Sequence, residues 1–238
     1  MISIVLPAHN EEGYLETAVK TVVAGLRESG QPFEVIIAEN GSTDRTGDEL
    51  TRLETTIPEV SAIRLPEADY GAALRGGFLA ARGQIVVNFD VDLVDLAFLR
   101  QAVERIDADD ADGVAIVVGS KRAPGSRDHR SVGRRAVTTV FSLILRYGFG
   151  LRVSDTHGVK AMRRAAVEPF VRASRLGEDV FDTELILRVE RAGLRVVELP
   201  VTVEELRPAR TPIWARIPKS IFRLAQLRVQ LWREHNRA

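Results

Sequence analysis

The sequence predicts an α/β fold in which a mostly parallel sheet is covered by helices on both faces. Short β-rich runs alternate with segments whose apolar residues recur at helical spacing, which is typical of parallel sheets. Polar segments rich in carboxylates and glycine follow these runs, at the edge where α/β proteins bind their ligands. The expected strands of the first half are Ile2–Leu6, Phe33–Ala38, Val60–Arg64 and Gln84–Phe89, the helical segments include Tyr14–Leu26 and Thr46–Leu53, and the polar segments are Pro7–Glu12, Glu39–Asp44, Asp69–Gly77 and Asp90–Asp95.

After Ala111 the alternation becomes less regular, but its segments still fit the same sheet. We interpret Asp107–Asp112 as an acidic turn, because strand patterns continue on both sides of it. No internal repeat or linker interrupts the chain, so residues 1–238 are expected to form one domain. The expected elements are a strand Gly113–Val118, an amphipathic stretch Val132–Tyr147, a mixed pattern Val153–Met162, a helix Val180–Ala192, strands Leu194–Leu199 and Val201–Glu204, and a helical stretch Ile213–Trp232.

The composition is that of a globular protein, with 45% apolar residues, 28% charged residues and a net charge of zero. The absence of cysteine excludes disulfides, thiolate metal sites and cysteine nucleophiles, and it fits a cytoplasmic location. The run Met1–Pro7 follows no basic leader and is interpreted as a strand, not a signal peptide. The longest nearly apolar stretch elsewhere, Ala136–Leu145, is about half of the ~20 residues that span a bilayer, so we expect no transmembrane helix.

A pair of acidic residues, Asp90 and Asp92, directly follows the apolar strand that ends at Phe89. Two carboxylates at a strand end can bind Mg²⁺ or Mn²⁺ together with the diphosphate oxygens of a nucleotide. Acidic residues in this position also commonly cap the next helix, so the pair by itself is a weak signal. Other motifs must decide between the two interpretations.

Three further segments resemble the family 2 glycosyltransferases, a group with the GT-A fold. Val5–Glu12 is similar to the family's Pro-x-Tyr-Asn-Glu segment, with His9 in place of the tyrosine. Ala38–Thr46 is similar to Asp-Asp-Gly-Ser-x-Asp-x-Thr, although Glu39 and Asn40 replace the two leading aspartates. Tyr70–Gly83 is similar to the glycine-bearing helix that precedes the Asp-x-Asp strand, and the motifs follow in family order. Neither a Walker A segment nor Gly-x-Gly-x-x-Gly is present.

The resemblance implies that residues 1–110 bind a nucleotide sugar with a divalent cation. Because Glu39 and Asn40 depart from the family pattern, the identity of the nucleobase stays open. A GDP-sugar and a UDP-sugar are therefore both expected as donors. Asp90 and Asp92 would bind Mg²⁺ or Mn²⁺. The residues expected to contact the donor are Pro7, His9, Glu11, Glu39, Asp44, Arg75 and Asp90.

The second half is similar to a narrower group, the dolichyl-phosphate sugar synthases. Ser154–Lys160 resembles their Asp-Thr-x-x-Gly-Phe-Lys segment, and Phe181–Leu185 resembles another of their segments. This implies that residues 111–205 bind a polyprenyl phosphate acceptor, with Asp155 and Lys160 on the acceptor side. A buried salt bridge or a turn would explain these two residues equally well.

Two stretches combine positive charge with an apolar stripe, as a lipid phosphate acceptor would require. One lies around Val132–Tyr147, and the other is the expected basic amphipathic helix within residues 206–238. Such helices commonly lie in a membrane interface, but apolar stripes also pack on the protein body. We expect a cytoplasmic protein bound peripherally to the inner face of a membrane, with a membrane-spanning partner as an additional anchor.

The implied reaction is a single inverting displacement at the anomeric carbon. Its catalytic residues would be Asp92 and Asp90, with Arg122 and Arg134 stabilising the leaving diphosphate. Arg210 and Lys219 are further cations for the acceptor side. A phosphate monoester is largely ionised at neutral pH and needs no base.

Asp179 separates the remaining alternatives. In a transferase acting on a soluble hydroxyl acceptor it would be the base, whereas here it can also serve as an N-terminal charge on the next helix. A catalytically silent nucleotide sensor is a further alternative. A nucleic-acid-binding protein is disfavoured by the zero net charge and the acidic crevice, so we expect no nucleic acid partner.

Overall fold

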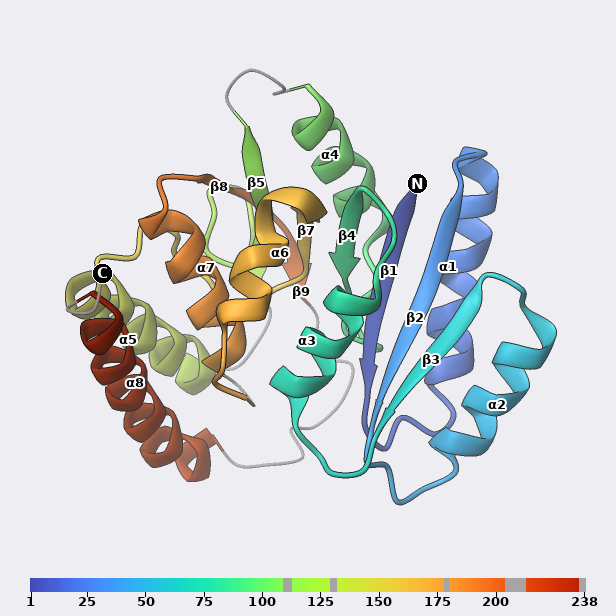
Figure 1. The fold of residues 1–238 in the computed structure, drawn as a ribbon, viewed down its shortest axis with the longest axis horizontal. Helices are drawn as coiled ribbons and strands as arrows, with labels where there is room; N and C mark the ends of the chain where they lie inside the picture. Colours follow the sequence, from blue (N-terminus) through green and yellow to red (C-terminus); the bar gives the residue numbers. More distant parts are fainter. Residues whose placement is uncertain (109–112, 129–131, 178–179, 204–212, 236–238) are drawn as a thin grey trace.

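The computed structural model describes residues 1–108, 113–128, 132–177, 180–203 and 213–235. Within these residues a seven-stranded sheet has the order β3-β2-β1-β4-β7-β5-β8, and every strand except β7 runs in the same direction. The predicted α/β fold with a mostly parallel sheet is therefore confirmed (Figure 1). The strands are β1 (Ile2–Ala8), β2 (Phe33–Asn40), β3 (Val60–Leu65), β4 (Ile85–Asn88), β5 (Val114–Ser120), β7 (Lys160–Arg163) and β8 (Arg195–Pro200).

Helices cover both faces of this sheet and enclose two apolar clusters. α1, α2 and α4 pack on one face, while α3, α5, α6, α7 and α8 contribute to the cluster on the other (Figure 1). Aspartates start two of these helices, because the side chains of Asp69 and Asp95 accept the backbone N–H of Ala72 and Phe98. The helices are α1 (Leu15–Ser29), α2 (Thr46–Thr56), α3 (Tyr70–Ala80), α4 (Leu96–Asp107), α5 (Val132–Phe149), α6 (Arg164–Ala173), α7 (Phe181–Arg191) and α8 (Ile213–His235).

The predicted elements of the first half agree with the structure to within three residues at each end. The second half departs further. The mixed pattern Val153–Met162 is a loop followed by β7. Within the strand expected at Val201–Glu204 the structure describes β9 (Thr202–Val203), and Glu204 lies outside the described residues. β9 pairs with β6 (Arg127–Asp128) in a separate two-stranded sheet.

The two amphipathic helices α5 and α8 lie side by side at one end of the molecule (Figure 1). The guanidinium of Arg228 donates to the carbonyl of Gly148 and lies 5.9 Å from the centre of the Phe149 ring. Leu227 is buried against the body, whereas Trp232 and Tyr147 are 65% and 81% exposed. Among the described residues, neither these helices nor any other is long and apolar enough to span a bilayer.

Candidate active site

The loops that follow β1 and β2 interlock at the carboxyl edge of the sheet. The Nδ1 atom of His9 lies 2.7 Å from the carbonyl oxygen of Asn40. Asn10 adopts a left-handed backbone conformation with φ of 55°, and its side-chain oxygen accepts the backbone N–H of Thr43 at 2.8 Å. Gly41 also has a positive φ, and a Cβ there would lie 2.8 Å from a backbone atom of Glu67. Only glycine allows the loop after β3 to approach this closely.

The acidic residues of these loops bind backbone donors. Glu39 accepts the N–H of Ser42 at 2.6 Å. Asp44 accepts the N–H groups of Thr46 at 3.0 Å and Glu12 at 3.3 Å. Burial would raise the pKa of Asp44, but the hydrogen bonds from Thr46 outweigh it and hold that pKa below its usual value. Both carboxylates therefore shape the loops that would surround a nucleotide.

Most of the residues expected to contact the donor meet at this edge, whereas Arg75 has a different environment. Pro7, His9 and Glu11 lie at the end of β1, beside Glu39 and Asp44 at the end of β2. The guanidinium of Arg75 donates to the carbonyls of Val171 and Arg172 at the end of α6, at 3.3 and 3.5 Å. In the structure Arg75 thus joins two helices.

Asp90 and Asp92 occupy a tight turn directly after β4. The N–H of Leu93 donates to the carbonyl of Asp90 at 2.9 Å, which leaves the Asp92 side chain exposed and that of Asp90 half-buried. The residue that caps α4 is Asp95. Asp90 and Asp92 therefore do not serve as the helix cap that the sequence left open as an alternative. The hydroxyl of Tyr70 donates to Asp90 at 3.1 Å and orients its carboxylate.

The charge environment of Asp90 fits a divalent cation. Burial and the negative charge of Asp92 raise the pKa of Asp90, although Lys160 and Tyr70 act in the opposite direction. Burial and the charge of Asp90 also raise the pKa of Tyr70 well above its usual value, so Tyr70 keeps its proton. Among the described residues no group of three or more metal-ligating side chains occurs. Two carboxylates nevertheless suffice for Mg²⁺ or Mn²⁺ when phosphate oxygens complete the coordination.

The reversed strand β7 places a second loop, residues 151–159, at the same edge. Because β7 runs antiparallel to β4 and β5, the loop before it lies beside the residues that follow those strands. Lys160, the first residue of β7, pairs with Asn88 of β4 and Val118 of β5. The Lys160 side chain is fully buried, and its ammonium lies 3.1 Å from Asp182 Oδ1 and donates to the Gly158 carbonyl at 2.7 Å.

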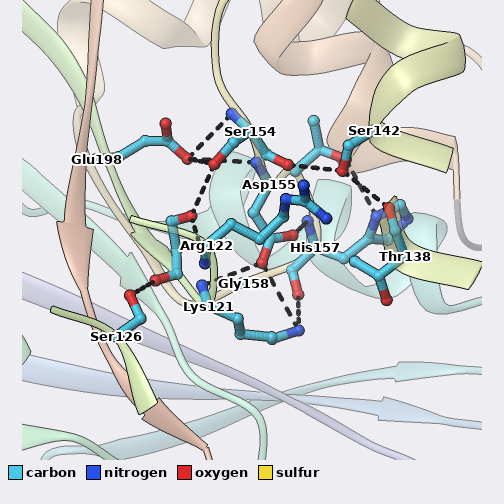
Figure 2. Close-up of polar contacts among 12 residues, drawn as sticks. Lys121, Arg122, Ser126, Thr138, Ser142, Ser154, Asp155, His157, Gly158 and Glu198 are labelled. Carbon is cyan, nitrogen blue, oxygen red and sulfur yellow. Dashed lines mark hydrogen bonds and ion pairs between the residues drawn. The ribbon is translucent and has the colours of Figure 1, made fainter. Parts of the chain in front are cut away.

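Glu198 of β8 accepts hydrogen bonds from this second loop, as Figure 2 shows. One oxygen of Glu198 accepts the N–H and the hydroxyl of Ser154 at 3.1 and 2.7 Å, and the N–H of Asp155 at 3.2 Å. From α5, the hydroxyl of Ser142 donates to the Ser154 carbonyl at 2.7 Å. The loop is therefore fixed to both the sheet and α5.

The same loop binds the cations that follow β5 (Figure 2). The ammonium of Lys121 donates to the His157 carbonyl at 3.2 Å and lies 3.9 Å from Asp155 Oδ2. Burial would raise the pKa of Asp155, but Lys121 and His157 outweigh it and hold that pKa below its usual value. Arg122 is exposed and donates to the Thr139 hydroxyl of α5 at 2.8 Å. Cationic groups thus line the edge two strands from Asp90.

Four of the expected site residues are not placed by the structure. Asp179 and Arg210 lie outside the described residues, and the side chains of Arg134 and Lys219 are not described. Conversely, sequence reasoning missed Tyr70, Asp182 and Glu198. The available signals were an acidic residue in the middle of the expected strand Leu194–Leu199 and the family-like segments Phe181–Leu185 and Tyr70–Gly83, which contain Asp182 and Tyr70.

Comparisons with known proteins agree on one family. The family described as Glycosyl transferase family 2 matches residues 3–170. The glycosyltransferase AglD of Haloferax volcanii is 35% identical over 85% of this chain, which spans about a third (33%) of that relative. An undecaprenyl-phosphate 4-deoxy-4-formamido-L-arabinose transferase of Pectobacterium carotovorum is 32% identical over 68% of this chain and 50% of its own length.

Solved structures share the fold at lower sequence identity. Glucosyl-3-phosphoglycerate synthase from Mycobacterium tuberculosis, in complex with Mn²⁺, UDP and glucosyl-3-phosphoglycerate, aligns with a TM-score of 0.61 at 22% identity, covering 92% of this chain and 75% of that one. A mannosyltransferase from Pyrobaculum calidifontis, in complex with GDP-Man and Mn²⁺, gives a TM-score of 0.61 at 23% identity, covering 100% and 64%. These likenesses support the GT-A fold predicted for the chain.

Proposed function

Because this chain belongs to glycosyltransferase family 2 and is a glycosyltransferase, we propose that it transfers a sugar from a GDP- or UDP-sugar to a polyprenyl phosphate. The observation that carries the proposal is the placement of two unlike groups at one sheet edge. The carboxylates of Asp90 and Asp92 follow β4, and the cations Lys121 and Arg122 follow β5, with only β7 between the two strands. Relatives named as polyprenyl-phosphate sugar transferases support the acceptor class.

On the donor side, the loops after β1, β2 and β4 would bind the nucleotide. Asp90 and Asp92 would hold Mg²⁺ or Mn²⁺, which offsets the negative charge of the leaving diphosphate. Tyr70 keeps Asp90 oriented through its hydroxyl, at 3.1 Å. The side chains of Asn10 and Asp44 already hold these loops together through hydrogen bonds from backbone N–H groups. Little reorganisation of the loops is therefore needed when a ligand binds.

On the acceptor side, Lys121 and Arg122 would hold the phosphate monoester. Since this group is largely ionised at neutral pH, its oxygen can attack the anomeric carbon directly and invert it, with no proton to remove. Asp155 orients Lys121, and Arg134, Arg210 and Lys219 stay predicted contributors of positive charge. Lys160 is fully buried, so we assign it no direct contact with the acceptor.

The exposed apolar faces of α5 and α8 would rest on the membrane that holds the polyprenyl chain. Large side chains exposed on these helices are Val140, Leu143, Ile144 and Tyr147 on α5, and Ile221, Phe222, Val229 and Trp232 on α8. The exposed guanidinium groups of Arg146 and Arg233 could bind anionic headgroups, each adding about 1 kcal/mol.

The proposal is tested by transfer of labelled sugar to lipid. Purified protein is incubated with Mn²⁺ or Mg²⁺, a panel of labelled GDP- and UDP-sugars and polyprenyl phosphate in detergent, and label extracted into organic solvent is measured. We expect label with one donor and its loss in Asp92→Ala.

A donor that binds with metal but never labels lipid would overturn the polyprenyl acceptor. The assay would then be repeated with soluble hydroxyl acceptors and with Asp179→Asn, since a base is required for a hydroxyl nucleophile.

A further inference from the structure

A fully buried ion pair begins at the residue of β7 that pairs with Asn88, the last residue of β4 before the proposed metal site. Lys160 at the start of β7 and Asp182 in the first turn of α7 are 0% and 2% exposed, with 3.1 Å between Nζ and Oδ1. Burying two charges costs several kcal/mol per ion before their attraction is counted, and apolar side chains of similar size often stabilise a fold better. Stability alone therefore gives a poor reason for this pair.

The pair is within electrostatic reach of Asp90. Lys160 pairs in register with Asn88, two residues before Asp90 on the same strand edge. Tyr70, which donates to Asp90, packs against the same apolar cluster as the buried residues of α7, so Asp90 and the Lys160–Asp182 pair lie toward the same face of the sheet.

The hydrogen bonding of this cluster is incomplete. Within the described residues, the side-chain oxygen of Asn88 is buried without a hydrogen-bond partner. Oδ1 of Asp182 also accepts no hydrogen bond, although it lies 3.1 Å from the Lys160 ammonium as an ion pair. The Lys160 ammonium instead directs its hydrogen bond to the Gly158 carbonyl, at 2.7 Å. Incomplete satisfaction of buried polar groups is uncommon and commonly marks a functional arrangement.

Counted as ionised, the carboxylates of Asp90, Asp92 and Asp182 exceed the one ammonium of Lys160 by two charges. A divalent cation at Asp90 and Asp92 matches this excess. Without Asp182, the carboxylates of the cluster left for Lys160 would be Asp90 and Asp92. A Lys160–Asp90 pair would then compete with the cation.

We propose that Asp182 is a positioning residue that holds Lys160 away from Asp90, so that the Asp90 carboxylate stays available to the divalent cation. This inference rests on the metal-dependent transfer proposed above. Lys160 pairs with Asp182 and not with Asp90, and the hydroxyl of Tyr70 donates to the Asp90 carboxylate at 3.1 Å.

The experiment measures Mn²⁺ binding, not activity. Free Mn²⁺ is titrated by its electron paramagnetic resonance signal with the full chain and with either UDP or GDP. In Asp182→Asn we expect the dissociation constant of Mn²⁺ to rise about tenfold, as for other residues that support metal ligands. Adding Lys160→Met to Asp182→Asn removes the competing cation, and this double variant should recover the affinity to within about threefold of wild type.

Glu184 provides the matched control on the same helix. Its buried carboxylate pairs with Arg188 at 2.8 Å, and the pair is not part of the cluster around Asp90. Glu184→Gln should lower the melting temperature but leave Mn²⁺ affinity within about twofold of wild type. Wild-type affinity in Asp182→Asn, or an equal loss in Glu184→Gln, would overturn the inference.

Two further outcomes complete the test. If Asp182→Asn does not fold, the neutral pair Lys160→Met with Asp182→Leu replaces it, and a folded double variant that has lost Mn²⁺ affinity would contradict the proposed role. If the wild type binds no Mn²⁺, or Asp92→Ala binds it equally well, the proposed metal site itself is wrong and the inference falls with it.

Discussion

The two halves of the molecule place their functional groups at the sheet edge in different ways. In the first half, the loops after parallel strands reach the edge directly, and their acidic residues bind nearby backbone donors. In the second half, the reversed strand β7 brings the loop before it to that edge, and this loop depends on Glu198 from β8 and Ser142 from α5. The first site half is built by loops that follow adjacent parallel strands, whereas the second also needs a reversed strand and anchors from β8 and α5.

We expect the largest loss of sugar transfer when the carboxylate pair of the first half is changed. Asp90→Asn should lower sugar transfer by about a thousandfold, because the neutral amide is a poor ligand for a divalent cation and cannot offset its charge. Asp95→Asn is the matched control. Asparagine caps helices as well as aspartate does, so transfer should stay within about twofold. Transfer is measured as labelled lipid at saturating donor, and equal activity of the two variants would refute the assignment.

The sequence was most informative where function and fold are local. Apolar runs such as Ile2–Ala8 identify strands, and the residues that follow them are then known to share one edge. Sequence spacing does not give strand direction, so the reversal of β7 could be reached only through the family resemblance. The same limit applies to buried charges. The sequence leaves Lys160 open between a place on the acceptor side and a buried salt bridge or turn. The structure shows the salt bridge, but no sequence pattern reveals that its partner is Asp182, 22 positions further on.

The next effect concerns the surface that only the second half carries. If α5 and α8 rest on a membrane, replacing Phe222 and Trp232 with serine removes two large apolar contacts. Binding to vesicles containing anionic lipid should fall at least about tenfold for each substitution. Tyr14, which is 50% exposed in the first half, is the control, and Tyr14→Ser should bind as wild type does.

Vesicle binding is measured by co-sedimentation at low and physiological salt. We expect salt to weaken the binding of all three variants and of the wild type, since cations on α5 and α8 contribute. Equal losses for Tyr14→Ser and Trp232→Ser would show that the exposed face of α8 is not the contact surface.

A smaller effect tests how strongly the second half depends on one long-range anchor. Glu198→Ala leaves the donors of Ser154 and Asp155 without their acceptor, which should cost about 1–3 kcal/mol in the free energy of unfolding. Glu54→Ala removes an exposed ion pair with Arg64 in the first half and should cost less than about 1 kcal/mol. Both are measured by urea denaturation. A cost for Glu198→Ala no larger than that for Glu54→Ala would contradict the anchoring role.

The smallest effect compares two buried carboxylates by their pH dependence. Neighbouring cations and hydrogen bonds lower the pKa of Asp155 in the loop before β7. At the opposite edge of the sheet, hydrogen bonds from Ser3 and Arg82 lower the pKa of Glu34. A carboxylate with a lowered pKa stabilises the fold above its ordinary pKa, and this contribution is lost as the pH falls through the lowered value. Asp155→Asn and Glu34→Gln should therefore each cost about 1 kcal/mol at pH 7.

Urea denaturation at pH 7, 5 and 3 should show the gap between the wild type and each variant narrowing as the pH falls, because these carboxylates take up protons in the unfolded wild-type chain at their ordinary pKa, above the lowered pKa of the folded state. The two variants should separate in activity. Asp155→Asn removes the carboxylate beside Lys121 and should weaken transfer to lipid, whereas Glu34→Gln lies at the amino ends of β1 and β2 and should leave transfer unchanged. If both variants lose stability alike and neither loses activity, Asp155 serves the fold of its loop and the assignment of that loop to the acceptor is wrong.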